Sequence, residues 1–215
     1  MALSVNSAAS CANNAGFGGV SPAPCPSSPC PAQQQALAFL LAAEDSATDA
    51  VNDLRIVRDS LRPGESIIAA AQQFIRLLQA SGNNQTNGVQ YAYTAVDVCM
   101  REGETREEVT DNFLSIYAPE GHGWNPTDVA ARAFHRIDSS IKKGETRDEA
   151  SAQYLRLRRA EGNLYDAAND YYVVDHFATD KESRVCEVSQ FIAILEKVGI
   201  DESETAQKLY AALHE

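Results

Sequence analysis

The chain has 215 residues, which suits one domain of ordinary size or one domain preceded by an arm. Its 18 Lys and Arg against 30 Asp and Glu give a formal net charge of −12, so a phosphate backbone would be repelled and nucleic acid is disfavoured as a direct partner. Hydrophobic residues make up 44% of the chain, which excludes wholesale disorder. No apolar run approaches the roughly 20 residues of a membrane span, so we expect no transmembrane segment and no membrane partner.

The N-terminal part of the chain is free of charge. Residues 1–43 contain no acidic side chain, no basic side chain and no histidine. We predict that residues 1–31 form an extended, uncharged arm rich in Pro, Ser, Ala and Cys, and that residues 32–215 form a helical domain. Such an arm can lie against another protein without desolvating ions, whereas the alternative is a terminus without a role. The candidate partner-binding residues of the arm are Cys25, Pro26, Pro29 and Cys30.

Two properties of the arm concern a possible secretion signal and the chemical state of its cysteines. No basic segment and no apolar segment precede Cys11, so we expect no secretion signal. Cys25 and Cys30 enclose four residues, a spacing compatible with reduced thiols, a disulfide or two ligands of a zinc site. The odd total of five cysteines and the lack of a nearby histidine favour reduced thiols, so no metal and no cofactor are predicted.

A short motif recurs in the helical part of the chain. Gly-Glu followed by Ser or Thr begins at residues 64, 103 and 144, and a degenerate fourth copy is expected at residues 199–203. We expect the glycine to end one helix in a left-handed conformation and the Ser or Thr to cap the next helix. Glu108 and Glu149 follow Thr105 and Thr146 by three residues, which predicts two capping boxes. Each motif therefore predicts a tight elbow between antiparallel helices.

Apolar residues at helical spacing follow each motif. In chain order, they predict helices from Ser66 to Gly82, from Thr86, after Thr105, from Pro126, from Thr146 to Gly162, and a last pair around residues 185–195 and 206–213. The segment Tyr171–Val174 has the composition of a strand but no strand to pair with, so we expect helix or extended linker there. The predicted fold class is all-α, with antiparallel helical hairpins in a repeat of roughly 40 residues, arranged as a bundle or short solenoid behind the N-terminal arm.

No catalytic motif is present in the sequence. The four histidines are scattered, and no nucleophile elbow or phosphate-binding glycine loop occurs. Trp124 lies in a loop before Pro126, where it either packs against the start of the next helix or contacts a partner, and it completes the candidate partner-binding residues. No catalytic residue, metal ligand or small-molecule substrate is predicted.

The most basic stretch has a structural interpretation. Arg156, Arg158 and Arg159 cluster in one predicted helix that Arg147 begins. Acidic residues stand at helical spacings from them, so we interpret this stretch as a solvated face balanced by its own acids; the alternative is a contact with an acidic partner. Those acids are Asp148, Glu149 and Glu161.

These observations favour a non-enzymatic structural or assembly protein. The most specific expectation is a virion component, in the capsid, portal or tail, whose arm docks on neighbouring protein subunits of a virion or cytoplasmic assembly. The alternative is a cytoplasmic helical-repeat adaptor that binds a protein or peptide. An enzyme with helix-borne carboxylates is a third hypothesis, which a cleft holding several acids of raised pKa would favour.

Overall fold

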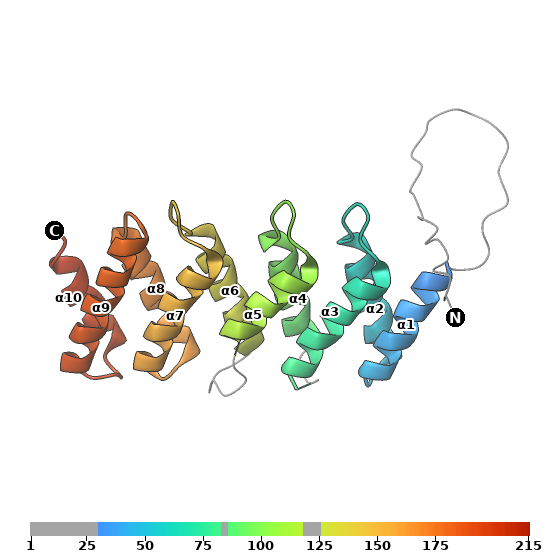
Figure 1. The fold of residues 1–215 in the computed structure, drawn as a ribbon. Helices are drawn as coiled ribbons and strands as arrows, with labels where there is room; N and C mark the ends of the chain where they lie inside the picture. The colour runs from blue at the N-terminus through green and yellow to red at the C-terminus, as the bar shows by residue number, and fades with distance from the viewer. Residues whose placement is uncertain (1–29, 83–85, 118–125) are drawn as a thin grey trace, which may run out of the picture. The chain divides into compact units, whose positions relative to one another are not determined.

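The computed structural model describes residues 30–82, 86–117 and 126–215, and this part of the chain is almost entirely helical (Figure 1). It contains ten α-helices and no strand, so the predicted all-α class is confirmed for the described residues. The segment Tyr171–Val174 is helical. The helices are α1 (Pro31–Ala43), α2 (Ala47–Asp59), α3 (Ile67–Ala80), α4 (Thr86–Cys99), α5 (Arg106–Ile116), α6 (Pro126–Ser139), α7 (Arg147–Glu161), α8 (Leu164–Phe177), α9 (Lys181–Val198) and α10 (Ser203–Ala212).

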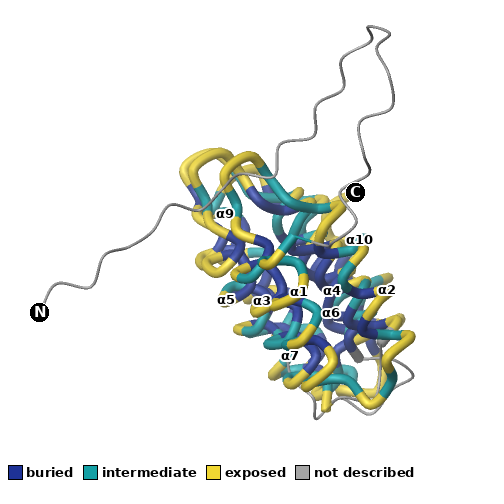
Figure 2. The backbone as a smooth tube through the Cα atoms, turned by 90° about the vertical axis from the view of Figure 1, so that its right-hand side faces the viewer, coloured by how far each residue is buried: buried dark blue, intermediate teal, exposed yellow. Residues whose placement is uncertain are grey.

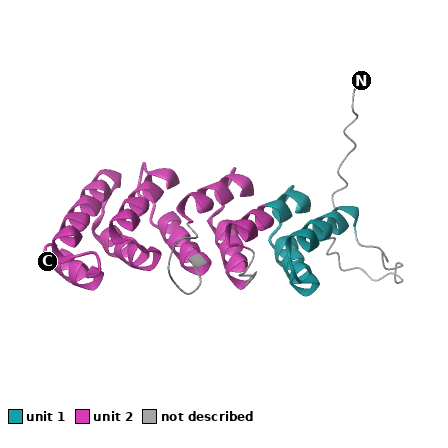
Figure 3. Cartoon of the chain, turned by 90° about the horizontal axis from the view of Figure 1, so that it is seen from below, with its two compact units in different colours: residues 1–72 teal, residues 73–215 magenta. Residues whose placement is uncertain are grey.

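The chain divides into two compact units, residues 1–72 and 73–215 (Figure 3). Unit 1 holds α1, α2 and the first residues of α3, and its buried core includes Ala36, Leu40, Ala50 and Val57. Unit 2 holds the remainder of α3 and α4 to α10. The boundary therefore falls inside the α3 helix.

The helices of unit 2 form two layers. One layer contains α5, α7 and α9, and the other contains α4, α6, α8 and α10, with each helix packed on the next member of its own layer and on its neighbours in the chain (Figures 1 and 3). Buried positions lie where helices face one another, and exposed positions lie on outward faces and at the turns (Figure 2). Edge-to-face aromatic pairs join neighbouring helices, with ring centroids 5.4–5.9 Å apart. The pairs are Phe113–Phe134, Tyr154–Tyr171 and Phe191–Tyr210.

The predicted elbows are four-residue turns, and the glycine sits differently from the prediction. α4 ends at Cys99, whereas Gly103 comes four residues later with a φ of 87°. It is the third residue of a turn closed by a 3.2 Å hydrogen bond from the Glu104 backbone N–H to the Arg101 carbonyl. A type II turn requires a positive φ at this third position, which explains the glycine without a role at the helix end. Gly64 and Gly144 occupy the same position in turns of their own.

Both predicted capping boxes are confirmed. The Thr105 hydroxyl accepts a hydrogen bond from the Glu108 backbone N–H at 3.2 Å, and the Glu108 carboxylate accepts one from the Thr105 backbone N–H at 2.8 Å. Thr146 and Glu149 form the same reciprocal pair with the same two distances. These bonds satisfy backbone donors that the first turn of a helix leaves without a partner.

The expected fourth copy at residues 199–203 does form a turn between two helices, but it lacks the side-chain cap that begins α5 and α7. Gly199 ends α9 at the turn into α10, and this turn lies at the opposite end of the helices from the elbows that follow α4, α6 and α8 (Figure 1). The elbow after α8 instead uses Asp180, which forms a capping box with Ser183. The Gly-Glu motif does not mark the elbow after α8 because no glycine occurs in that turn.

Each elbow of unit 2 contains a buried arginine paired with an aspartate nine residues earlier in the chain. The aspartate stands near the end of one helix, and the arginine begins or follows the first turn of the next helix. The nitrogen–oxygen distances are 3.0, 2.8 and 2.7 Å in chain order. We call these the elbow ion pairs: Asp97–Arg106, Asp138–Arg147 and Asp175–Arg184.

An aromatic ring lies under each of these guanidinium groups. The rings are those of Tyr93, Phe134 and Tyr171, with centroids 4.8, 5.7 and 5.2 Å from the guanidinium carbon. Each ring stands thirteen residues before its arginine in the chain. A buried guanidinium needs such partners because it cannot lose its charge. The ion pair and the ring therefore connect the end of one helix to the start of the next at each elbow.

Arg147 also connects two successive elbows, which corrects its interpretation as part of a solvated face. Its side chain is 4% exposed, and it donates to Glu104 at 2.8 Å and to the Cys99 carbonyl at 2.7 Å. Arg158 likewise donates to the Ile116 carbonyl at 3.0 Å. These partners lie more than forty residues away in the chain, so the helical spacings of the sequence do not reveal them.

Candidate interaction groove

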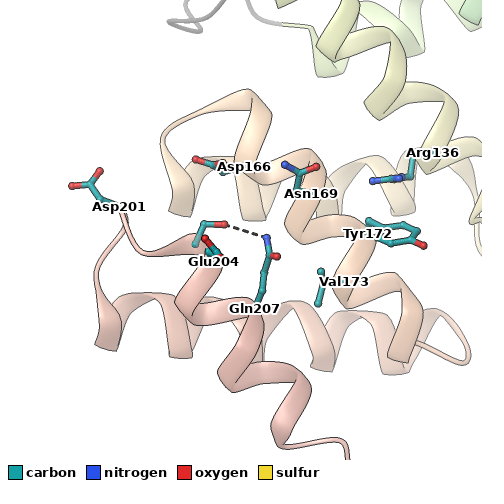
Figure 4. Close-up of a pocket in the computed structure, with 9 residues that line it drawn as sticks. Arg136, Asp166, Asn169, Tyr172, Val173, Asp201, Glu204 and Gln207 are labelled. Atoms are coloured by element: carbon teal, nitrogen blue, oxygen red, sulfur yellow. Dashed lines mark hydrogen bonds between the residues drawn. The ribbon is translucent and has the colours of Figure 1, made fainter.

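An open groove lies between α8 and α10 in unit 2, with one side chain contributed by α6 (Figure 4). Its volume is about 700 Å³. The two helices start at the same end of unit 2, so first-turn residues of both line one end of the groove and later residues of α8 line the other. The lining residues are Arg136, Asp166, Asn169, Tyr172, Val173, Asp201, Ser203, Glu204 and Gln207.

One end of the groove is acidic. Asp166 follows the Asn163 cap of α8: its carboxylate accepts a hydrogen bond from the Asn163 side-chain amide, and its backbone N–H donates one to the Asn163 side-chain oxygen. Asp201 stands in the turn before α10. Glu204 is in the first turn of α10, where a negative charge is favourable at a helix N-terminus. Helix capping and the helix dipole thus account for the acids locally, and the packing of α8 beside α10 brings them to one end of the groove.

The other end is aromatic. Tyr172 is 55% exposed, and the Arg136 guanidinium lies 4.0 Å from the centre of its ring. Figure 4 shows Arg136 and Tyr172 together, away from Asp201 at the acidic end. Asn169 and Gln207 lie between these ends. The Gln207 Nε2 already donates to Asp170 and Ser203, which leaves its amide oxygen as an acceptor, whereas the Asn169 amide is able both to donate and to accept. The groove therefore offers an acidic end, an amide-bearing middle and an aromatic end.

A buried pair of carboxyl groups lies behind the groove. Asp170 is fully buried, and its Oδ1 accepts hydrogen bonds from Ser203 at 3.0 Å and from Gln207 at 2.6 Å. Glu161 is 4% exposed, and burial followed by its hydrogen bond to Asp170 raises its pKa to about 9. Burial also raises the pKa of Asp170. At neutral pH Glu161 is therefore protonated.

Unit 1 contains a second pair with the same spacing along the chain. Glu44 follows α1 directly, and Asp53 is fully buried in α2 nine residues later. Burial, followed by a hydrogen bond to Asp53, raises the pKa of Glu44 to about 8. Glu161 and Asp170 are likewise nine residues apart, across the turn from α7 to α8. In both hairpins, α1–α2 and α7–α8, a glutamate of raised pKa stands at the end of the first helix, nine residues before a buried aspartate of the second helix.

The raised pKa of Glu161 does not by itself make the groove a catalytic cleft. General acid catalysis needs the acid within hydrogen-bonding reach of the reacting group. Glu161 and Asp170 do not line the groove, and Ser203 and Gln207 separate Asp170 from it. Within the described ranges, no three His, Cys, Asp or Glu side chains come together as ligands for a metal ion. The buried carboxyl pair is therefore not among the groups that a ligand in the groove would contact directly.

None of the sequence-predicted partner-binding residues lines this groove, and only Cys30 is among the described residues. Cys25, Pro26, Pro29 and Trp124 are outside the described residues. Cys30 is the half-buried N-cap residue of α1 and belongs to unit 1, whereas the groove belongs to unit 2.

No sequence motif marks the groove, but the spacing of two Glu–Asp pairs in the sequence indicates an aspartate behind it. The lining residues come from three separate stretches, at position 136, positions 166–173 and positions 201–207. Their convergence depends on the packing of α6, α8 and α10, which a motif search does not supply. The nine-residue spacing of the two Glu–Asp pairs is visible in the sequence and marks one of the aspartates behind the groove.

In the parts of the chain that the structure describes, no helix combines the length and apolar character needed to cross a bilayer. Comparison of the chain with protein-family models, with curated proteins and with solved structures finds no match.

Proposed function

We propose that this protein is a helical-repeat adaptor that binds a segment of a protein partner in the groove between α8 and α10. The observation that carries the proposal is the groove itself: an accessible, mainly polar depression with amide groups between an acidic end and an exposed aromatic ring. Asn and Gln side chains can satisfy both the N–H and the C=O of a peptide, and exposed aromatic residues supply contact area at low entropic cost.

A hairpin repeat of roughly 40 residues is part of this proposal. What supports it is the recurrence of the elbow ion pairs: their arginines stand at positions 106, 147 and 184. Stacked hairpins of this kind give a rigid surface because each one packs on its neighbours. The interelbow contact of Arg147 with Glu104 adds rigidity, since it crosses from one hairpin to the next.

Selection of random peptides displayed on phage, with the full chain as bait, tests this proposal. We expect the selected peptides to lose binding to an Asn169→Trp variant, which fills the middle of the groove, because α8 holds this residue in the groove lining. They should still bind the matched variant Ala152→Trp, which adds the same side chain at an exposed position of α7. Peptides that bind both variants equally would show that the groove is not the binding surface.

A second candidate function is a structural subunit of a large assembly, most specifically a virion, with residues 1–31 docked on a neighbouring subunit. The charge-free composition of residues 1–43 supports it, because such a segment loses no ion hydration on docking. Hydrogen exchange on the isolated chain and on the native particle tests this role. Protection of residues 1–43 in the particle and rapid exchange in the isolated chain are expected; rapid exchange in both would contradict it.

A further inference from the structure

The acidic end of the groove has more negative charge than its neighbours neutralise. Among the described residues, Asp201 makes no hydrogen bond or ion pair, and the side-chain partner of Asp166 is the neutral Asn163. Glu204 pairs with Lys208 at 2.8 Å, but both side chains are more than 70% exposed. Such an exposed pair contributes little and exchanges readily for another partner.

Two residues of the groove lining are held in place by a buried carboxyl group. The Oδ1 of Asp170 accepts hydrogen bonds from Ser203 and Gln207, which line the groove, so this carboxyl group lies one side chain beneath the groove surface. In the described part of the chain, no lysine, arginine or histidine forms an ion pair with Asp170 or Glu161. No buried cation behind the groove therefore offsets the acids at its surface.

The positive charges near the groove do not cancel this end. Arg136 is held over the Tyr172 ring at the aromatic end, and its Nη1 contacts the Ala168 carbonyl at 3.5 Å. Figure 4 places Asp166, Asp201 and Glu204 toward the other end of the groove, with Asn169 and Gln207 between. The groove is therefore polarised along its length.

A metal ion is not the cation that suits this arrangement. The described acids do not form a group of three close enough to bind one ion. A lysine ammonium has three donors and an arginine guanidinium has five, so either can pair with acids at one end of a groove that are not grouped closely enough to bind one metal ion. A peptide that carries such a side chain can also place its main chain along Asn169 and Gln207.

We propose that the groove binds an extended segment of a partner protein through a lysine or arginine placed among Asp166, Asp201 and Glu204, with the main chain of the segment crossing Asn169 and Gln207. This inference rests on the proposed adaptor function and adds the chemistry of the partner. The net charge of −12 favours approach of a basic partner from a distance, whereas the groove provides the position at which it binds.

The test compares two variants with the same change of charge. Asp201→Asn with Glu204→Gln neutralises two acids of the groove, and Asp148→Asn with Glu182→Gln neutralises two exposed acids in the first turns of α7 and α9. The probes are fluorescein-labelled synthetic peptides with the sequences enriched in the phage selection. We expect enrichment of Lys and Arg, an increase in Kd of about tenfold for the groove variant at 0.15 M salt, and less than about a twofold increase for the control variant.

Three results would overturn the basic-segment proposal or its basis, and they are distinguishable. The first result is a set of peptides that lose binding to Asn169→Trp but contain no Lys or Arg, or bind the groove charge variant with unchanged Kd. This result would refute the basic partner and leave the adaptor function standing. Equal weakening by both charge variants would show attraction to the overall charge of the protein, which refutes a specific basic site. Absence of any peptide sensitive to Asn169→Trp would refute the adaptor function itself.

Discussion

Arg147 and Glu104 join two successive elbows of unit 2, with Nη1 of the arginine donating to Oε1 of the glutamate at 2.8 Å. The same guanidinium group contacts Asp138 within its own elbow ion pair and the carbonyl of Cys99. Its charge is thus distributed over two carboxylates and a peptide group from three parts of the chain. Removal of this side chain would leave all three acceptors short of a donor in a largely buried site.

We therefore expect Arg147→Ala to lower the free energy of unfolding by about 3–5 kcal/mol, which is typical when one partner of a buried ion pair is removed. Arg159→Ala is the control, because Arg159 lies in the same helix with an exposed side chain and should change stability by less than about 0.5 kcal/mol. Urea titration followed by circular dichroism measures both. A loss for Arg147→Ala no larger than that of the control would contradict the structural role of the elbow ion pairs.

The sequence predicts the capping boxes of two elbows but not the charge network within the elbows. Thr105 with Glu108 is readable because a capping box acts over three residues of one helix start. The acids at helical spacing around Arg147 indicate local pairing, but its partners lie across an elbow and in the preceding elbow. The nine-residue spacing of aspartate and arginine recurs at three elbows, so this interval is visible in the sequence as a repeat across predicted turns.

The groove shows a stronger limit of sequence interpretation. Asp166 and Glu204 each have a complete local explanation as first-turn acids of a helix, and nothing in either segment indicates that they share a surface. Only the packing of α8 on α10 brings them to one groove. Trp124, which the sequence singles out, lies outside the described residues, so its predicted partner contact remains a prediction.

Stability should fall as pH rises because of Glu161. Its pKa is about 9 in the folded chain and about 4.5 for an ordinary glutamate, so the folded state binds the proton more tightly. The resulting stabilisation is fully present below about pH 4.5 and is lost progressively as pH rises toward 9. Between pH 4.5 and pH 7 this loss is on the order of 2–3 kcal/mol.

Glu161→Gln removes this titration while its amide can still donate a hydrogen bond to Asp170. We expect the variant to be more stable than the natural chain at pH 7 and above, with a difference that shrinks toward pH 4.5. Thermal unfolding at pH 5, 7 and 9 measures the difference, and the exposed Glu182→Gln serves as the control. A difference that stays constant with pH would show that Glu161 is ionised in the folded protein.

The turn glycines should be sensitive to substitution for reasons of backbone geometry alone. Gly144 has a φ of 78°, and a Cβ atom added there would meet no other atom within 4 Å. We expect Gly144→Ala to cost about 1 kcal/mol, the usual penalty for a left-handed alanine, and Gly144→Asn to cost less. Lys143→Ala at the preceding exposed position should be nearly neutral in the same urea titration. Equal stability of Gly144→Ala and the natural chain would argue against the left-handed turn.

Two cysteines of unit 2 should differ sharply in reactivity. Cys99 is 2% exposed, and burial followed by the charge of Asp138 raises the pKa of its thiol to about 12. Cys186 is exposed on α9. Because the thiolate is the species that reacts, iodoacetamide at pH 8 should alkylate Cys186 within minutes and Cys99 only after the chain unfolds. Peptide mapping by mass spectrometry distinguishes the two sites, with a urea-denatured sample as the positive control. Rapid labelling of native Cys99 would mean that the α4–α5 elbow opens far more often than its buried ion pair allows.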